Sequence, residues 1–122
     1  MDVKRGDVFF INTPRPVEGH VQGGRRPWVV VQNDVGNRYS DTTLVVPLTT
    51  KFKRLNMPTH CPVSWGPVRS GVVECEQVRV IDIKNDWKYI ATLPEEVMTH
   101  IDKALYNAFF FKGYEKGAGD DE

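Results

Sequence analysis

The segment GHVQGGRRPWVVVQNDVGNRYSDTTLVVPLTT, from Gly19 to Thr50, contains the two clearest strand patterns of this 122-residue chain. Trp28 to Gln32 is a continuous apolar run of the kind that a buried strand shows. Asn33 to Asp41 is dense in turn-forming residues, and a second strand is expected from Thr42 to Leu48. Two glycines and two arginines precede the first run, and two threonines follow the second. Because such groups suit phosphate binding, a functional site is expected where these strands meet.

The rest of the chain predicts a mainly β domain with a C-terminal helix, in the α+β class. Strand-like runs occur at Asp7 to Asn12, Thr59 to Ser64, Gly71 to Cys75 and Val78 to Ile83. Pro62 indicates an edge strand or a bulge. Leu93 to Lys112 has apolar residues at helical spacing, which predicts a helix packed on the sheet. Short strands with one terminal helix favour a small, strongly bent antiparallel sheet or partial barrel.

The connections divide the chain into one domain, residues 1–112, and an acidic tail, residues 113–122, that we expect to be disordered. Thr13 to Arg26 is a long polar connection, interpreted as a mobile flap over a site. Lys51 to Pro58 is expected to be irregular or one helical turn, and Trp65 to Ser70 a turn.

Charge is distributed unevenly although the formal net charge is zero. Residues 1–60 hold nine Lys and Arg against five Asp and Glu, a balance of +4, and residues 61–122 have the opposite balance. The basic residues of the first half either form one positive surface for a phosphate backbone or a solvated, salt-bridged face. The residues concerned are Arg15, Arg25, Arg26, Arg38, Lys51, Lys53 and Arg54.

Two other features indicate the cellular compartment in which the protein is expected to act. Cys61 and Cys75 lack the spacing of a zinc site, so we expect reduced thiols in the core rather than a disulfide. The sequence shows no secretory signal pattern and no apolar run of membrane-spanning length, so a cytoplasmic location is expected.

A succession of short blocks resembles the MazF/PemK family of toxin endoribonucleases over about residues 3–110. The blocks are KRGDV, QGGRRP, QNDVGNRYS, PLTT, PTH and EQVRVID, starting at Lys4, Gln22, Gln32, Pro47, Pro58 and Glu76. The resemblance implies an SH3-like barrel with helices, assembled as a homodimer. It also implies single-stranded RNA as substrate and a cognate antitoxin, with an acidic, partly disordered segment, as partner.

The resemblance implies that Arg26 and Thr49 are the catalytic pair. Arg26 would clamp a phosphate with its fork of donors, and Thr49 would donate a hydrogen bond to a phosphoryl oxygen. RNA can be cut without a metal when its own 2′-hydroxyl attacks the phosphorus, leaving a 2′,3′-cyclic phosphate and a 5′-hydroxyl. No HExxH or DxD spacing is present, so this route, with no metal and no cofactor, fits the sequence better than a two-metal route.

The proton acceptor is open between two candidates, because arginine, with a pKa above about 12, is a poor base. His20 is attractive because imidazoles titrate near neutral pH, and some PemK-branch members have GHEQ where this chain has GHVQ. Glu76 is the other candidate, at the place where that branch carries a functional Asp. Val21 and Glu74 depart from the branch's pattern, which leaves its acid/base pair without a complete counterpart here.

Six further residues are candidate RNA contacts: Gln22, Arg25, Asn33, Asn37, Lys51 and Gln77. Asn33 and Asn37 are equally interpreted as plain turn residues. Glu76 and Gln77 either hydrogen-bond loop backbone or read base edges of single-stranded RNA. A second class of function is also open, a non-enzymatic toxin or binding module that resembles the gyrase-poisoning CcdB toxins. The QGGRRP and PLTT blocks favour the nuclease, since such a binder needs no Arg and Thr around a phosphate.

Overall fold

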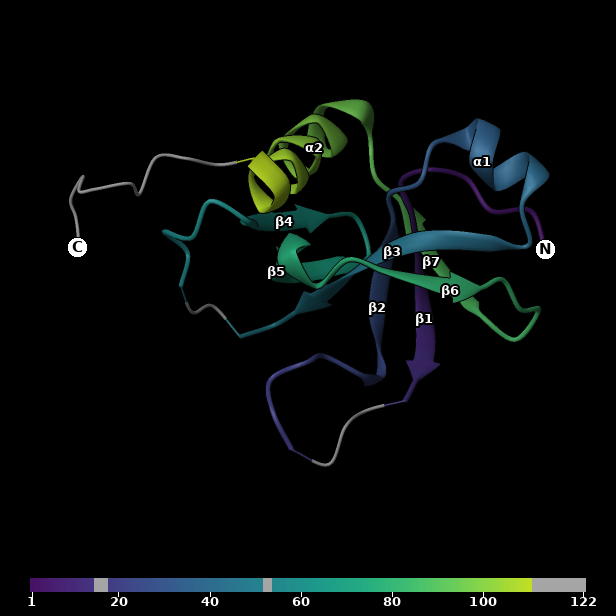
Figure 1. Ribbon diagram of the computed structural model, residues 1–122, viewed down its shortest axis with the longest axis horizontal. Helices are drawn as coiled ribbons and strands as arrows, with labels where there is room; N and C mark the ends of the chain where they lie inside the picture. Colours follow the sequence, from purple (N-terminus) through teal and green to yellow (C-terminus); the bar gives the residue numbers. More distant parts are fainter. Residues whose placement is uncertain (15–17, 52–53, 111–122) are drawn as a thin grey trace.

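The computed structural model describes residues 1–14, 18–51 and 54–110. Along these residues the elements are β1 (Asp7–Thr13), β2 (Gly24–Val30), α1 (Asp34–Tyr39), β3 (Thr42–Thr49), β4 (His60–Trp65), β5 (Val68–Glu74), the 3-10 turn η1 (Cys75–Gln77), β6 (Arg79–Asp82), β7 (Lys88–Thr92) and α2 (Glu95–Phe110). The strands form one sheet in the order β4-β5-β3-β2-β1-β7, with β6 paired to β3, and every pairing among them is antiparallel. The predicted antiparallel sheet with a C-terminal helix is therefore confirmed (Figure 1).

The bend of the sheet is located in β3, which changes partner along its length. Its first half, Thr42 to Val45, pairs with β6, and its end, at Leu48 and Thr49, pairs with β5. Close approach at the second pairing requires Gly71, because a Cβ added there would lie 2.6 Å from the Thr49 carbonyl oxygen. The curl brings the end of β3 next to β5 and η1, with β4 on the far side of β5, and chemically active side chains gather there.

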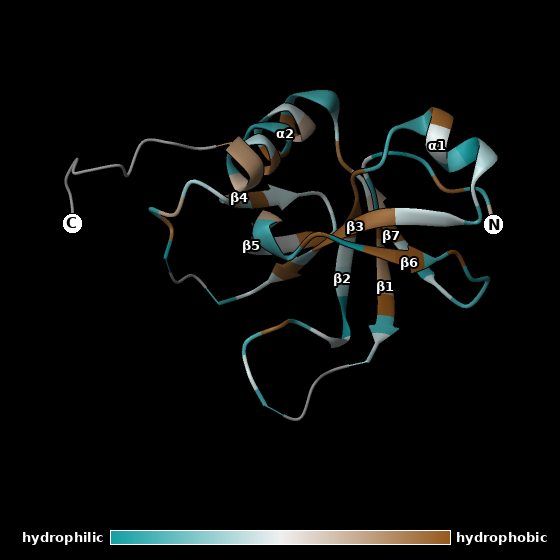
Figure 2. Cartoon of the chain, viewed as in Figure 1, coloured by the Kyte–Doolittle hydropathy of each residue, from teal (hydrophilic) through white to brown (hydrophobic). Residues whose placement is uncertain are grey.

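Two hydrophobic clusters lie on opposite faces of the central strands. Alternation along β2 sends Trp28 and Val30 into one cluster and Val29 into the other. The cluster with Val29 includes Met98 of α2, and the cluster with Trp28 and Val30 includes Trp87. Figure 2 shows the hydrophobic colour along β1 and β6, whereas the coloured part of the β1–β2 loop is mostly white or hydrophilic. The apolar core thus fixes the strands and leaves that loop to solvent and to the site.

Helix α2 covers the sheet near β4 and η1, as its apolar spacing predicts. Met98, Ile101 and Ala104 are buried. Phe109, counted in the predicted apolar stripe, is instead 68 % exposed. The helix begins at Glu95 rather than Leu93, and the predicted end at Lys112 lies outside the described residues, as does the predicted disordered tail. No helix within the described ranges is long and apolar enough to cross a membrane.

Two predictions for the first half of the chain are wrong. Strand β2 begins at Gly24 rather than Trp28, since its first half pairs only with β1 and a proline is tolerated in such an edge segment. The expected Asn33 to Asp41 turn contains helix α1. The side chain of Asn33 caps it by accepting a hydrogen bond from the Gly36 N–H, 2.8 Å away, so a residue interpreted as a turn former acts as a helix cap.

The second half differs from the prediction in two places. The Trp65 to Ser70 turn is shorter than expected, because β4 and β5 continue to a tight hairpin at Gly66 and Pro67. Strand β7 is missing from the prediction although it completes the sheet beside β1. The edge position expected for the strand with Pro62 is confirmed, since β4 is the last strand at its side of the sheet and carries an irregularity between Val63 and Trp65.

The two thiols are buried and free, as expected for core cysteines. Burial raises the pKa of the Cys61 thiol, and burial with the nearby Cys61, Glu76 and Asp102 raises that of Cys75 further. Because only the thiolate reacts, we expect the native protein to take up almost no iodoacetamide at pH 8 and two equivalents in guanidinium, measured by intact mass. Stoichiometric labelling of the native protein would contradict this placement.

Candidate functional site

A polar cavity of about 450 Å³ lies between the β1–β2 loop, the end of β3 and the β4–β5–η1 region. Its lining combines cationic, carboxylate, imidazole and hydroxyl groups. The residues are Gly19, His20, Val21, Gln22, Arg26, Thr49, Lys51, Arg54, Met57, His60, Glu74, Glu76 and Gln77. The fold therefore brings together Arg26, Thr49, His20 and Glu76, the four candidate catalytic residues, with three of the six candidate RNA contacts.

Arg26 and Arg25 occupy opposite sides of β2. The half-buried Arg26 lines the polar cavity, and its Nε–H donates to the Gly23 carbonyl oxygen 3.0 Å away, which sets the plane of the guanidinium. The Arg25 guanidinium lies over the ring of Phe10, 5.0 Å from its centroid, and lines a different cavity. Alternation along an extended strand explains the separation, and only Arg26 is placed to clamp a phosphate beside Thr49.

Thr49 is the last residue of β3 and is 9 % exposed. Its Oγ1 accepts a hydrogen bond from the backbone N–H of Lys51 at 3.2 Å. Since that bond uses a lone pair of the oxygen, the hydroxyl hydrogen can be donated to an acceptor in the cavity. Thr49 is thus available as a hydrogen-bond donor to a group in the cavity.

The loop before β2 is held against η1 in its described part, residues 18–23. The Gln22 N–H donates to Gln77 Oε1 at 2.6 Å, and Gln77 Nε2 donates to the His20 carbonyl oxygen at 3.2 Å. Gln22 Nε2 donates to Glu74 Oε1 at 2.8 Å. These bonds place residues 18–23 against η1 and show the Gln77 amide bonded to loop backbone, and the mobility of the flap stays a prediction.

His60 is a cavity residue that the sequence reasoning did not single out. Its Nδ1 lies 3.0 Å from the Arg54 carbonyl oxygen and its Nε2 3.1 Å from Glu76 Oε2. Both partners accept hydrogen bonds, so an imidazole with N–H on both nitrogens satisfies both. Glu76 Oε1 also accepts from Thr59 Oγ1 at 2.9 Å. The Glu76 carboxylate is therefore fixed by two donors. The PTH block was the only signal that pointed to His60.

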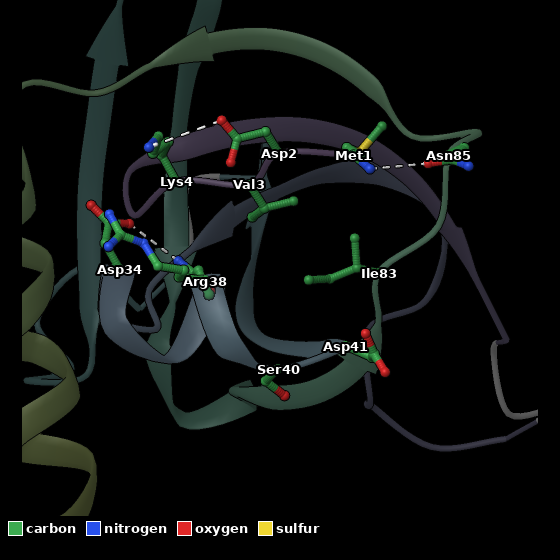
Figure 3. A pocket seen from close by; sticks show the side chains of 11 residues that line it. Met1, Asp2, Val3, Lys4, Asp34, Arg38, Ser40, Asp41, Ile83 and Asn85 are labelled. Carbon is green, nitrogen blue, oxygen red and sulfur yellow. Dashed lines mark hydrogen bonds and ion pairs between the residues drawn. The ribbon is translucent and has the colours of Figure 1, made fainter.

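Three other predicted residues lie outside this cavity. Asn37 is buried beside α1, where Thr43 Oγ1 donates to its Oδ1 at 2.7 Å. Asn33, the cap of α1, is equally remote from the lining of the polar cavity. Asn37 and Arg38 line a separate hollow near the N-terminus, whose side chains Figure 3 shows. There the Arg5 backbone N–H lowers the pKa of Asp34.

The five described residues of the basic group in the first half are divided among three hollows, which leaves the two interpretations of this group open. Arg26, Lys51 and Arg54 line the polar cavity, but Arg25 and Arg38 line two others. Arg15 and Lys53 lie outside the described residues. The separation follows from strand alternation at Arg25 and from the unexpected helix at Arg38.

The fold and the cavity define a class: a small curled antiparallel sheet with one covering helix, and a cationic and hydroxyl-bearing pocket at the strand end where the sheet bends. Residues 4–109 match the family model described as "PemK-like, MazF-like toxin of type II toxin-antitoxin system". The chain belongs to this family.

Individual relatives agree with this assignment. The chain is 42 % identical over 108 residues to Endoribonuclease EndoA of Bacillus subtilis, covering 86 % of this chain and 92 % of that protein. Its structure is similar to that of MazF from Deinococcus radiodurans, with a TM-score of 0.73, 25 % identity, and coverage of 88 % of this chain and 96 % of that one. A MazE-MazF structure from Deinococcus radiodurans has a TM-score of 0.69 at 24 % identity, covering 88 % and 95 % of the two chains, which shows the shared fold.

Proposed function

We propose that this protein is a toxin endoribonuclease that cleaves single-stranded mRNA without a metal ion, and so inhibits translation and growth. The observation that carries the proposal is the convergence of Arg26, Thr49 and Glu76 on one polar cavity. A guanidinium, an oriented hydroxyl and a fixed carboxylate are the groups that a phosphodiester transfer through the 2′-hydroxyl requires. Family membership and the EndoA relative support the same activity.

Each group has a defined part in the reaction. Glu76 accepts the proton of the 2′-hydroxyl as its oxygen attacks the phosphorus, and the bond from phosphorus to the 5′-oxygen breaks. Arg26 and Thr49 donate to the phosphoryl oxygens as charge builds on them. His20, exposed on the loop that borders the cavity, gives a proton to the departing 5′-oxygen. The products are a 2′,3′-cyclic phosphate and a 5′-hydroxyl.

Glu76 is assigned as the acceptor because its carboxylate is fixed by His60 and Thr59. Glu76→Gln is expected to lower the single-turnover rate by about a hundredfold to ten-thousandfold, the range of general acid–base catalysis. His20→Asn should also slow cleavage of ordinary RNA. In a substrate with sulfur in place of the 5′-oxygen at the cut site, the leaving group needs no proton. This substrate should therefore restore the cleavage rate of His20→Asn but leave that of Glu76→Gln slow. If the sulfur substrate restored only the rate of Glu76→Gln, Glu76 would be the proton donor and His20 the proton acceptor.

A non-enzymatic binder of the CcdB kind is distinguished from a nuclease by two assays run on one preparation. The nuclease predicts that a long RNA is cut at a limited set of sites in excess EDTA, and that DNA supercoiling by gyrase continues at the same protein concentration. Intact RNA together with inhibited supercoiling would reject the nuclease in favour of the binder.

We further propose that the protein is a homodimer neutralised by an antitoxin with an acidic segment that competes with RNA. The cationic lining of the cavity, Arg26, Lys51 and Arg54, is the feature that favours an acidic competitor. Sedimentation at micromolar concentration should give a dimer mass, and added antitoxin should reduce RNA cleavage in proportion to its occupancy. A purely monomeric protein, or cleavage unaffected by a saturating antitoxin, would contradict this arrangement.

A further inference from the structure

Three side chains from three adjoining elements converge at one wall of the polar cavity. His60 of β4 and Glu74 of β5 are directly opposite each other in the strand ladder, and Glu76 follows two residues later in η1. One ligand atom from each lies within 4.8 Å of the others. Cross-strand partners have closely spaced Cβ atoms, so the backbone itself sets this arrangement. The sequence, with His60 far from both glutamates, gave no metal-ligand spacing to detect.

Each of the three side chains is oriented by a partner outside the trio. His60 Nδ1 is 3.0 Å from the Arg54 carbonyl oxygen, Glu76 Oε1 accepts from Thr59 Oγ1 at 2.9 Å, and Glu74 Oε1 accepts from Gln22 Nε2 at 2.8 Å. Metal-binding histidines typically donate their second N–H to a carbonyl or carboxylate, and binding carboxylates are themselves hydrogen-bonded. These outer contacts leave Nε2 of His60 and one oxygen of each glutamate for a shared ion.

The chemistry of the trio selects the kind of ion. Imidazole nitrogen with two carboxylates suits a borderline transition metal such as Zn²⁺, whereas Ca²⁺ and Mg²⁺ prefer oxygen ligands in larger numbers. With Zn–N and Zn–O bonds of about 2.0–2.2 Å, tetrahedral ligand atoms are about 3.3–3.6 Å apart. His60 Nε2 and Glu76 Oε2 are already 3.1 Å apart. Small movements of Glu76, whose side chain is 35 % exposed, and of Glu74 would complete the geometry.

The charges of the two carboxylates provide a second, independent reason to expect a bound cation. Glu74 is only 5 % exposed, and a second carboxylate lies beside it. Two close carboxylates repel each other, and a divalent cation between them relieves that repulsion. The cationic residues Arg26, Lys51 and Arg54 line the same cavity and oppose a metal there, so the two carboxylates have to supply the attraction. On binding, His60 Nε2 exchanges its proton, released to solvent, for the metal.

We infer that His60, Glu74 and Glu76 form a zinc-binding site with three protein ligands and a fourth position open to the cavity. The site regulates rather than catalyses, because the metal takes the Glu76 carboxylate that accepts the 2′-hydroxyl proton. That inhibitory consequence rests on the proposed function, but the binding itself does not. Zinc therefore holds the protein in a folded state that is unable to cleave.

Binding is tested first, without RNA, by titrating chelator-stripped protein with Zn²⁺ in a calorimeter and by Co²⁺ absorption. One ion per protomer and a raised melting temperature are expected. His60→Asn and Glu76→Gln should each weaken binding more than about a hundredfold. Thr59→Val, which keeps the shape of the side chain but loses the bond to Glu76, should weaken it by about tenfold to a hundredfold. His100→Asn, on the exposed face of α2, is the matched control and should bind as the wild type does.

Two results would overturn the site. One is no Zn²⁺ binding to the wild-type protein at micromolar concentration, and the other is binding by the His60→Asn and Glu76→Gln variants that is as strong as that of the wild type. Inhibition is tested separately by cleavage with added Zn²⁺, which EDTA should reverse and which Thr59→Val should shift to higher zinc concentration. If the protein binds zinc through these residues but cleaves no RNA in EDTA, the proposed function fails and the site stands. If RNA is cut and zinc does not bind, only the site fails.

Discussion

Arg26→Ala is expected to lower the single-turnover rate of RNA cleavage by about a hundredfold to a thousandfold, the usual loss when a donor to developing transition-state charge is removed. Arg26 borders the same cavity as Thr49 and has its guanidinium oriented by the Gly23 carbonyl oxygen. The change removes a half-buried side chain at the edge of the sheet, so the melting temperature should change little. Rapid-quench kinetics with enzyme in excess gives the rate, and a thermal melt checks the fold.

Two neighbouring variants make the Arg26 result specific. Arg26→Lys should remain slow, since an ammonium is a point charge without the bidentate fork of a guanidinium. Arg25→Ala is the matched control, because Arg25 is adjacent in sequence but lines a different cavity over Phe10. It should cut the same bonds, with at most weaker and less salt-dependent binding. A larger loss of rate in Arg25→Ala than in Arg26→Ala would show that the assignment is wrong.

A single 2′-deoxy substitution at the cut site should abolish cleavage there. The proposed reaction uses that hydroxyl as its nucleophile, so its removal leaves no group to attack the phosphorus, whatever the protein supplies. Two oligonucleotides that differ only at this position, assayed under single-turnover conditions in excess EDTA, give the comparison.

The control for that experiment is a 2′-deoxy substitution one nucleotide downstream of the cut. It changes the ribose content equally but keeps the nucleophile, so cleavage should continue at a similar rate. Equal rates for the oligonucleotide lacking the scissile 2′-hydroxyl and for its all-ribose parent would mean that water or a side chain attacks instead, and the roles given to Glu76 and Arg26 would fail with it.

The strands were predictable where burial imposes a simple pattern. The apolar runs around Val29 and Val46 and the helical spacing around Ile101 are consequences of packing against one core, and the structure has these elements. Helix α1 was missed because its six residues include Gly36 and Asn37, which have low helix propensity. Its stability comes from the Asn33 cap and from the bonds of buried Asn37 to Gln32 and Thr43, which depend on the fold.

The candidate site could be predicted from the sequence only in part, because some of its contacts also depend on the fold. Strand alternation after Gly24 separates Arg25 from Arg26, and this could be inferred from neighbouring residues. The meeting of His60 with Glu74 depends on the register of the β4–β5 hairpin, and no local pattern gives that register. The bonding of Gln77 to the loop backbone depends on how a segment more than fifty residues earlier in the chain folds back, so its two interpretations were equal until the fold was known.

The chemical ends of the fragments test the central claim most directly, which is that the RNA's own 2′-hydroxyl cleaves the chain without a metal ion. A defined RNA is cut by the wild-type protein in excess EDTA, and the fragments are analysed by mass spectrometry. The mechanism predicts a 2′,3′-cyclic phosphate on each upstream fragment and a 5′-hydroxyl on each downstream fragment, with neither formed by Arg26→Ala on the same time scale. Fragments with a 3′-hydroxyl and a 5′-phosphate, or cutting that requires added metal, would contradict it.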